Sequence, residues 1–170
     1  MARKWGKVDY KELEALRDRL EQFQKVDVDA FCEKMAKEIA ARLLRRVKQK
    51  TPVGEYETIT YTKKDGSTIT FNDGKEGGTL RNNWKVQKTV SKSGTVYEIE
   101  IYNPMEYASY VEYGHRQQVG RFVPHIGKRL KSGWVEGKFM LKVSEEEIQS
   151  IAPKLLEKRL NEELRRLFNA

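Results

Sequence analysis

The sequence predicts a single α+β domain over residues 1–170: an antiparallel sheet of three to four strands, flanked by two N-terminal helices and a kinked C-terminal helix, with a projecting β-hairpin. Three observations predict this class. Apolar residues recur at helical spacing near both ends of the chain, apolar and polar residues alternate in its middle, and a proline stands inside the last helical stretch. A chain of 170 residues is also long enough to bury a core without a metal or disulfides.

Two helices are predicted in the N-terminal part of the chain. The first runs from Asp9, a suitable N-cap, to about Gln24, and its apolar residues at helical spacing are Leu13, Leu16, Leu20 and Phe23. The second runs from about Asp29 to Gln49 and ends at Thr51-Pro52. Its apolar residues, four apart, are Phe31, Met35, Ile39, Leu43 and Val47. The two helices can pack as an antiparallel pair, although the loose join between them also leaves the first free to serve a neighbouring subunit.

Residues 55–78 form a β-hairpin insertion with a glycine-rich return. Pairing Tyr61 with Ile69, and Ile59 with Phe71, puts these apolar side chains on one face of the hairpin. That register requires a three-residue loop, 64–66, in which the glycine at position 66 supplies the positive φ of a bulge turn. Since an isolated hairpin is only marginally stable, the apolar face is expected to lie on the domain's own sheet or on another chain.

A second hairpin is predicted from two alternating segments, 84–90 and 95–102. If Trp84, Val86 and Val90 share a face with the apolar residues of the second segment, the pairing closes on a two-residue Ser93-Gly94 turn. This hairpin is the expected centre of the fold.

The tyrosine-rich run 102–116 predicts a short helix followed by a long loop. Asn103-Pro104 ends the preceding strand, and a helix from Met105 to Tyr113 is stopped by a glycine. Tyr107, Tyr110 and Val111 share one side of this helix and are expected to anchor it on the sheet, with Ser109 and Glu112 on the other side. Residues 117–139 show neither period, which indicates a long loop with a short helical turn.

The last helix is predicted to begin at Ser144, which acts as N-cap while Glu147 reaches back to it. Pro153 lies about two turns in and removes one backbone hydrogen bond, so a bend is expected there. The distal part, 154–168, is expected to pack on the sheet or on the second helix.

The net charge of +8 gives the protein a basic bias. The densest cluster of basic residues is Arg42, Arg45, Arg46, Lys48 and Lys50. Of these, the candidates for contact with a polyanion are Arg42, Arg45, Arg46 and Lys50. Two interpretations remain open: a solvated helix face whose cations suit a helix C-terminus, or a contact surface for DNA or an acidic partner.

Little in the sequence indicates catalysis. A nuclease would use His115 or His125 as general base beside an arginine, but no acidic pair or histidine motif at metal-ligand spacing accompanies them. The single cysteine, Cys32, is expected to be a small helix-face residue. The sequence therefore predicts a non-enzyme with no cofactor and no metal. No apolar run approaches the length of a membrane span, and the N-terminus has no signal-peptide pattern.

Aromatic side chains beside glycines and cations suggest protein interfaces, because they combine rigid contact area with directional hydrogen bonds. Two patches are predicted, the hairpin 56–71 and the loop 114–139. The candidate interface residues are Tyr113, His115, Arg116, Trp134, Phe139, Ile59, Tyr61, Ile69 and Phe71.

Four motifs occur in a fixed order: TPVGEYE at 51–57, GGTLRNNW at 77–84, YNPMEYASYVEYGHR at 102–116 and GWVEGKFML at 133–141. In this order they resemble a family of lambdoid siphophage tail components, named after the product of gene ten in one such phage. The resemblance runs from about Phe31 to the C-terminus. It departs from the family in the insertion between Val53 and Gly78, a segment that family members often keep very short.

The resemblance implies a structural protein of the phage or prophage head–tail junction, acting in the neck or in tail completion. Implied partners are copies of itself in a ring, the head connector, and the tail-tube or tail-terminator proteins. The implied locations are the bacterial cytoplasm during assembly and then the virion neck or tail. The alternatives are a basic nucleic-acid-binding module and a small nuclease.

Overall fold

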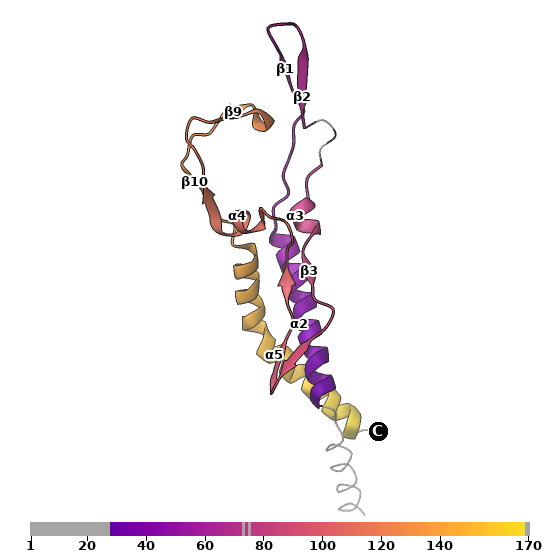
Figure 1. Cartoon of the computed structure of the whole chain (residues 1–170). Coiled ribbons are helices and arrows are strands. Elements are labelled where there is room, and N and C mark those ends of the chain that lie inside the picture. The colour runs from indigo at the N-terminus through magenta and orange to yellow at the C-terminus, as the bar shows by residue number, and fades with distance from the viewer. Residues whose placement is uncertain (1–27, 73, 75, 169–170) are drawn as a thin grey trace, which may run out of the picture.

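The computed structural model describes residues 28–72, 74 and 76–168, and the structural statements below refer to these residues. Two helices, α2 and α5, run side by side in opposite directions and give the molecule its long axis (Figure 1). A β-hairpin projects past one end of α2 (Figure 1). The predicted helix from Asp9 to Gln24 lies outside the described residues. Within the described part of the chain, no helix is long and apolar enough to cross a membrane.

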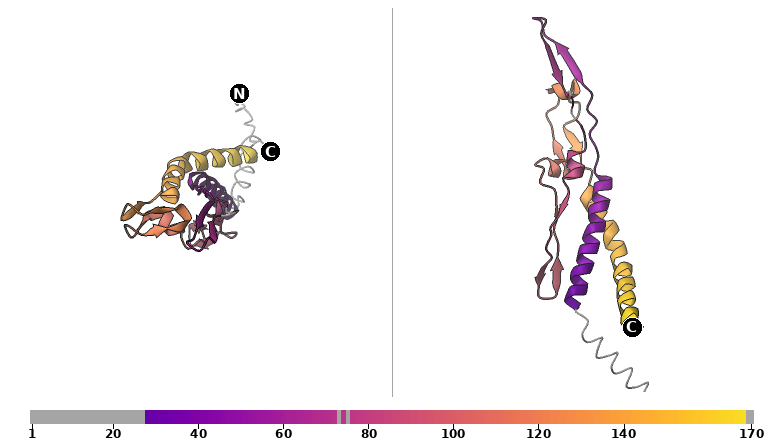
Figure 2. Two further views of the ribbon diagram at one scale, coloured as in Figure 1. Left: turned by 90° about the horizontal axis from the view of Figure 1, so that it is seen from above. Right: turned by 90° about the vertical axis from the view of Figure 1, so that its right-hand side faces the viewer.

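The helix α2 spans Val28–Lys50 and buries Met35, Ala40 and Val47. The helix α5 spans Met140–Phe168 and contains Pro153. It bends along its length (Figure 2), as expected for a proline that removes an internal hydrogen bond. The predicted packing of its distal part on the second helix is confirmed, because Arg159 binds Glu38 of α2.

The strands form separate antiparallel pairs, so the predicted single sheet of three to four strands is wrong. The pairs are β1 (Ile59–Thr62) with β2 (Thr68–Phe71), β3 (Lys85–Val86) with β6 (Ile101–Tyr102), β4 (Ser91–Ser93) with β5 (Val96–Glu98), β7 (Gly114–Arg116) with β10 (Trp134–Glu136), and β8 (Phe122–Val123) with β9 (Lys128–Arg129). Each strand has only two to four residues. Edges this short offer little length for a further strand to join.

The β1–β2 hairpin has the predicted register. Ile59 pairs with Phe71, and Tyr61 pairs with Ile69. The loop is closed by hydrogen bonds from Lys63 N to Ser67 O (2.7 Å) and from Gly66 N to Lys63 O (3.0 Å). Gly66 has φ of 82°, the positive value that a three-residue bulge turn needs.

For the second hairpin, the predicted register is confirmed at the base and is wrong at the tip. At the base Val86 pairs with Ile101, as the predicted register requires. At the tip Ser93 pairs with Val96, so the turn is Gly94-Thr95 and not Ser93-Gly94. Gly94 has φ of 61° and stands first in the turn, where a two-residue turn favours glycine. Four residues, 87–90, therefore lie opposite two, 99–100, and the pairing is interrupted after the hydrogen bond from Gln87 N to Glu100 O (2.8 Å).

The core lies where the end of α2 meets the short helix α3 (Thr79–Asn82) and the start of α5. Its buried members are Val47, Leu80, Trp84 and Met140. Partly buried side chains pack around them, including Ile101 and Val111. Residues 117–139, predicted as a long loop, are more ordered than expected: they hold β8, β9, β10 and the predicted helical turn, a 3-10 helix η1 at Pro124–Ile126.

Candidate functional site

The residues of the first two sequence motifs meet at the C-terminal end of α2. Thr51 is fully buried, and its hydroxyl donates to the carbonyl of Val47 (2.6 Å) while accepting from the indole Nε1 of Trp84 (2.8 Å). The guanidinium of Arg81 donates twice to the carbonyl of Thr51, from Nε (2.9 Å) and Nη2 (2.7 Å). These bonds satisfy the end of the helix and fix α3 against it.

The third motif joins the same region through Asn103. Its side-chain amide donates to the carbonyl of Leu80 (2.8 Å), and its Oδ1 accepts from the backbone N–H of Met105 (3.1 Å). The asparagine therefore holds the turn before the helix α4, which spans Ala108–Tyr113. Its role in this structure is to position backbone.

Glu112 of α4 holds the start of α5. The Glu112 side chain is 5% exposed. Its carboxylate accepts from the backbone N–H of Leu141 (3.0 Å) and of Lys142 (3.1 Å), and its own carbonyl accepts from the N–H of Phe139 (3.0 Å). A carboxylate at this place satisfies N–H groups that have no partner within the helix and suits the positive end of the helix dipole.

The predicted cap at Ser144 is therefore wrong. The helix begins at Met140, so Ser144 lies inside its second turn, fully buried, and donates to the carbonyl of Met140 (2.6 Å). Glu147 instead pairs with Lys50 of α2 (2.7 Å), which lowers the pKa of the Glu147 carboxyl. The residue before Met140 is Phe139, which is not a capping type, so nothing in the local sequence marks this helix start; the acceptor for its N–H groups comes from Glu112, which lies 28 positions earlier in the chain.

The predicted anchoring of α4 is right for Val111 and wrong for the tyrosines. Val111 packs against the core, together with Ala108. Tyr107 is 40% exposed and Tyr110 is 58% exposed. The helix is rotated relative to the prediction because its buried face is set by Ala108, Val111 and Glu112, and the tyrosine rings turn outward.

The glycines of the last two motifs allow close backbone packing. Gly114 has φ of 83°, and a Cβ there would lie 2.4 Å from the carbonyl oxygen of Val135. A Cβ at Gly137 would lie 2.4 Å from the carbonyl oxygen of Glu112. Any side chain at these positions would force β7 away from β10, or β10 away from the end of α4.

The candidate interface residues of this region lie around the β7–β10 pair. Tyr113 is 62% exposed, Trp134 is 44% exposed, and Phe139 is also exposed. Arg116 pairs with Trp134 in the strand register, and His115 pairs with Val135. The ring of His115 lies 5.7 Å from that of Tyr110, tilted by 50°. Tyr113, Trp134 and Phe139 leave aromatic surface open to solvent. We call the five candidates of this region the β7–β10 patch: Tyr113, His115, Arg116, Trp134 and Phe139.

The hairpin candidates lie against the chain's own 117–139 segment. Tyr61 makes edge contacts with Phe71 (5.8 Å between ring centroids) and with Phe122 (6.1 Å). Phe71 makes an edge contact with His125 (5.2 Å), and Asn72 donates to the carbonyl of His125 (2.7 Å). Ile59, Tyr61 and Phe71 are thus half-buried, whereas Ile69 is exposed. The two predicted patches touch each other in one chain, and the hairpin face is partly covered.

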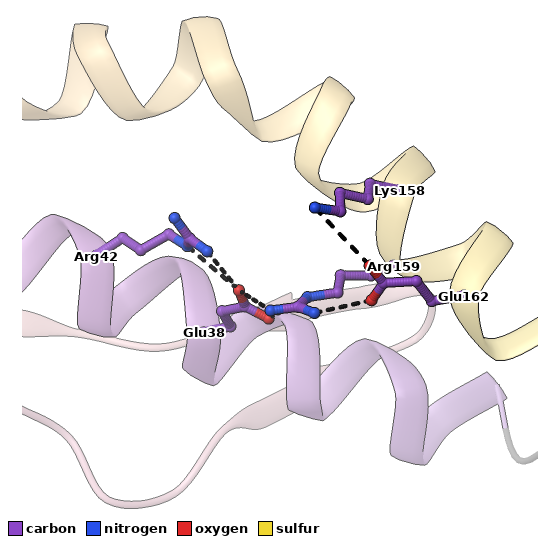
Figure 3. A network of polar contacts seen from close by, with 5 residues as sticks. All are labelled: Glu38, Arg42, Lys158, Arg159 and Glu162. Atoms are coloured by element: carbon purple, nitrogen blue, oxygen red, sulfur yellow. Dashed lines mark hydrogen bonds and ion pairs between the residues drawn. The ribbon is translucent and has the colours of Figure 1, made fainter.

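The basic cluster is largely paired with acidic groups. Arg42 binds Glu38 (2.8 Å), and Arg46 and Lys50 both approach Glu147, at 3.7 Å and 2.7 Å. Glu38 also accepts hydrogen bonds from Arg159 of α5, which in turn binds Glu162. The contacts around Glu38 and Arg159 therefore form one network between the two helices (Figure 3). Arg159 first, and Arg42 second, lower the pKa of Glu38 from 4.5 to about 2.

The two histidines lie in different settings. His125 is exposed and its Nδ1 lies 3.2 Å from Oδ1 of Asn72, whereas Nδ1 of His115 is buried without a hydrogen-bond partner. Among residues 28–72, 74 and 76–168, no group of three or more His, Cys, Asp and Glu side chains is placed to hold a metal ion. Cys32 is a half-buried free thiol on α2, on a helix face as expected.

The fold is of the α+β class, and its motif residues hold helix ends and backbone in place. A sequence model of the family described as "Bacteriophage HK97-gp10, putative tail-component" matches residues 14–114. The chain belongs to this family, as its motifs predicted. The match ends at Gly114, so the 133–141 motif lies beyond it. No match was found among curated proteins or among solved structures. Membership suggests a structural, non-enzymatic role as a component of the phage tail.

Proposed function

We propose that the protein is a neck or tail-completion subunit that forms a ring at the junction between the head connector and the tail tube or tail terminator. Family membership supports a tail component. The junction, the ring and the partners go beyond that membership. Assembly would take place in the bacterial cytoplasm, before the subunit enters the virion.

The observation that carries this proposal is the balance of buried and exposed apolar side chains. Within the described part of the chain, seven apolar side chains are buried, whereas seventeen large ones are exposed. Soluble monomers expose single apolar residues commonly, but aromatic residues gathered in one place are typical of protein interfaces. Tyr113 and Trp134 of the β7–β10 patch are the most plausible centres, because exposed Tyr and Trp contribute most where they become fully desolvated.

A closed ring needs two different patches on each subunit, since each copy meets the next head to tail. The β7–β10 patch is one candidate. The end of the β1–β2 hairpin, where Ile69 remains exposed, is the other. Because Ile59, Tyr61 and Phe71 are held against residues of the 117–139 segment, the hairpin would be presented in a fixed orientation.

The test is the mass in solution, with negative-stain imaging, of the protein alone and with purified connector or tail-tube protein. We expect rings, at least when a partner is present. Trp134→Ala together with Tyr113→Ala should abolish them, whereas Tyr102→Ala, a matched change at an exposed tyrosine outside the patch, should not. A protein that stays monomeric with both partners would contradict the proposal.

Contact with nucleic acid is the second candidate, and one groove favours it. Arg42, Arg45 and Arg46 line it from α2, beside Ile148 and Ile151 of α5. Within the described residues, however, Arg42 and Arg46 have acidic partners, which reduces the charge left for phosphate. A DNA affinity that falls steeply with salt and weakens in Arg45→Gln would support this candidate, and salt-independent or absent binding would remove it.

A further inference from the structure

A groove with an apolar floor and polar edges, the latter including Gln87 and Ser91, runs along the N-terminal half of α2. Its lining comes from two sides: Ala36 and Ile39 of α2, and Tyr97 and Ile99 of the β4–β5 hairpin and the residues after it. The groove has a volume of about 730 Å³ and is open to solvent on one side. The hairpin lies alongside this part of α2 (Figures 1 and 2).

The two walls of the groove are held together at the start of α2. Asp29 accepts hydrogen bonds from Lys92 and from the hydroxyl of Tyr97. The bond to Lys92, and then that to Tyr97, lowers the pKa of the Asp29 carboxyl. The hairpin is thereby tied to the first turn of the helix, and the apolar side chains behind it stay partly uncovered.

We propose that the groove is the docking site of the chain's own N-terminal segment, Asp9 to Gln24, folded back antiparallel on α2. This inference does not depend on the proposed role at the head–tail junction. The segment precedes α2 directly and carries leucines at helical spacing, at positions 13, 16 and 20. A 16-residue amphipathic helix is marginal by itself in water and needs an apolar surface to cover its stripe.

The length of the connection fits an antiparallel pair. Only residues 25–27 separate the segment from Val28, and helix–helix connections of about 2–8 residues are usual between antiparallel neighbours. With residue 24 opposite residue 28, Leu16 comes opposite Ala36 and Leu13 comes opposite Ile39. Both α2 residues line the groove, so the connection alone brings the leucine stripe to it.

The charges of the two surfaces are also complementary. The lining residues include Glu98 and Glu100 and no Lys or Arg. Arg17 lies on one edge of the leucine stripe, where it can approach these carboxylates, and Arg19 shares the other edge with Glu12. A segment with acidic residues on both edges would be repelled from this groove.

The chain offers a direct test, because Cys32 is its only cysteine and lies on α2 one turn before Ala36. The same pairing puts Leu20 opposite Cys32. Under mild oxidation of the dilute full chain, Leu20→Cys should form an intrachain disulfide with Cys32, in a yield about tenfold above that of Asp18→Cys on the opposite helix face. Adding Cys32→Ser should abolish it. Equal yields for the two variants, or no disulfide at all, would overturn the proposal. Disulfides between chains would also overturn it, because they would assign the groove to a second copy of the protein.

Hydrogen exchange gives a second measurement without a new cysteine. Backbone amides of residues 9–24 should exchange on the order of tenfold more slowly in the unmodified protein than in Ala36→Arg, which blocks the groove. The matched change Leu160→Arg, at an exposed residue of α5, should leave them protected. Unprotected amides in the unmodified protein, or protection that survives Ala36→Arg, would overturn the proposal.

Discussion

Replacement of Glu112 by alanine is the change expected to reveal most about this fold. The carboxylate is 5% exposed and accepts two backbone hydrogen bonds at the start of α5. Without it, two part-buried N–H groups lose their acceptor, and the positive end of the helix dipole loses its counter-charge. The change removes no large apolar contact, so its effect on stability would come mainly from the cap.

The magnitude follows from the two bonds. A hydrogen bond to a charged group contributes about 1.5–3 kcal/mol, and the cost of burying the carboxylate offsets part of that sum. We therefore expect Glu112→Ala to lower the free energy of unfolding by about 3 kcal/mol. For a chain of this size, that corresponds to a fall in Tm of roughly 6–12 °C. Glu112→Gln, which keeps one acceptor oxygen and loses the charge, should cost about 2 kcal/mol.

Urea unfolding followed by circular dichroism would measure this loss, with Glu106→Ala as the control. Glu106 lies just before α4 and is exposed, so its replacement should change stability by less than about 0.5 kcal/mol. If Glu112→Ala and Glu106→Ala were equally stable, the carboxylate would not be the cap of α5, and the reasoning would be refuted.

Three further predictions concern the same framework. Thr51→Val should lower the free energy of unfolding, measured in urea, by about 1–3 kcal/mol, because the buried indole N–H of Trp84 loses its acceptor. Thr51→Ser keeps the hydroxyl and should behave as the unmodified protein. Equal unfolding free energies for the two variants would contradict this. Gly114→Ala should cost about 3 kcal/mol, against about 1 kcal/mol for Gly120→Ala, since both have positive φ but only Gly114 faces a carbonyl oxygen at 2.4 Å. The pKa of Glu38 in the folded protein, about 2, lies below its usual 4.5. The stability that the ionised Glu38 carboxylate contributes is therefore complete above about pH 4.5 and is lost as the pH falls toward 2. Arg159→Met should remove part of this acid-sensitive stability, so that the variant loses less stability than the unmodified protein as the pH falls from 4.5 toward 2; acid unfolding curves that coincide would refute this.

The β1–β2 hairpin could be predicted in detail because its information is local. Alternating Ile, Tyr and Thr set the face of each side chain, and only one loop length keeps the apolar residues together. Gly66 then occupies the one position that needs positive φ. The tip of the second hairpin was mispredicted because two extra residues in the first strand, within 87–90, shift the pairing, so the register at the base does not extend to the turn.

The tyrosine helix shows where local pattern fails. Two faces of α4 carry apolar atoms, since Tyr107 and Tyr110 lie on one side and Ala108 and Val111 share the other with Glu112. Apolar spacing alone favours burying the large rings. Their actual exposure follows from Glu112, whose carboxylate binds the N-terminus of α5 and so turns its own face inward. A residue that caps a helix distant in sequence leaves no local signal of that role.

The sequence by itself determined the family, the α+β class, the extent of α2, the register of the first hairpin and the presence of a bend-forming proline in α5. These depend on residue periodicity, turn chemistry and motif order, which neighbouring residues define. Only the tertiary structure decided that the strands stay in separate pairs, that Glu112 rather than Ser144 caps α5, and that the hairpin base lies against residues 122–127. Those outcomes depend on contacts between segments far apart in the chain, where a buried carboxylate or a backbone N–H must find its partner in space.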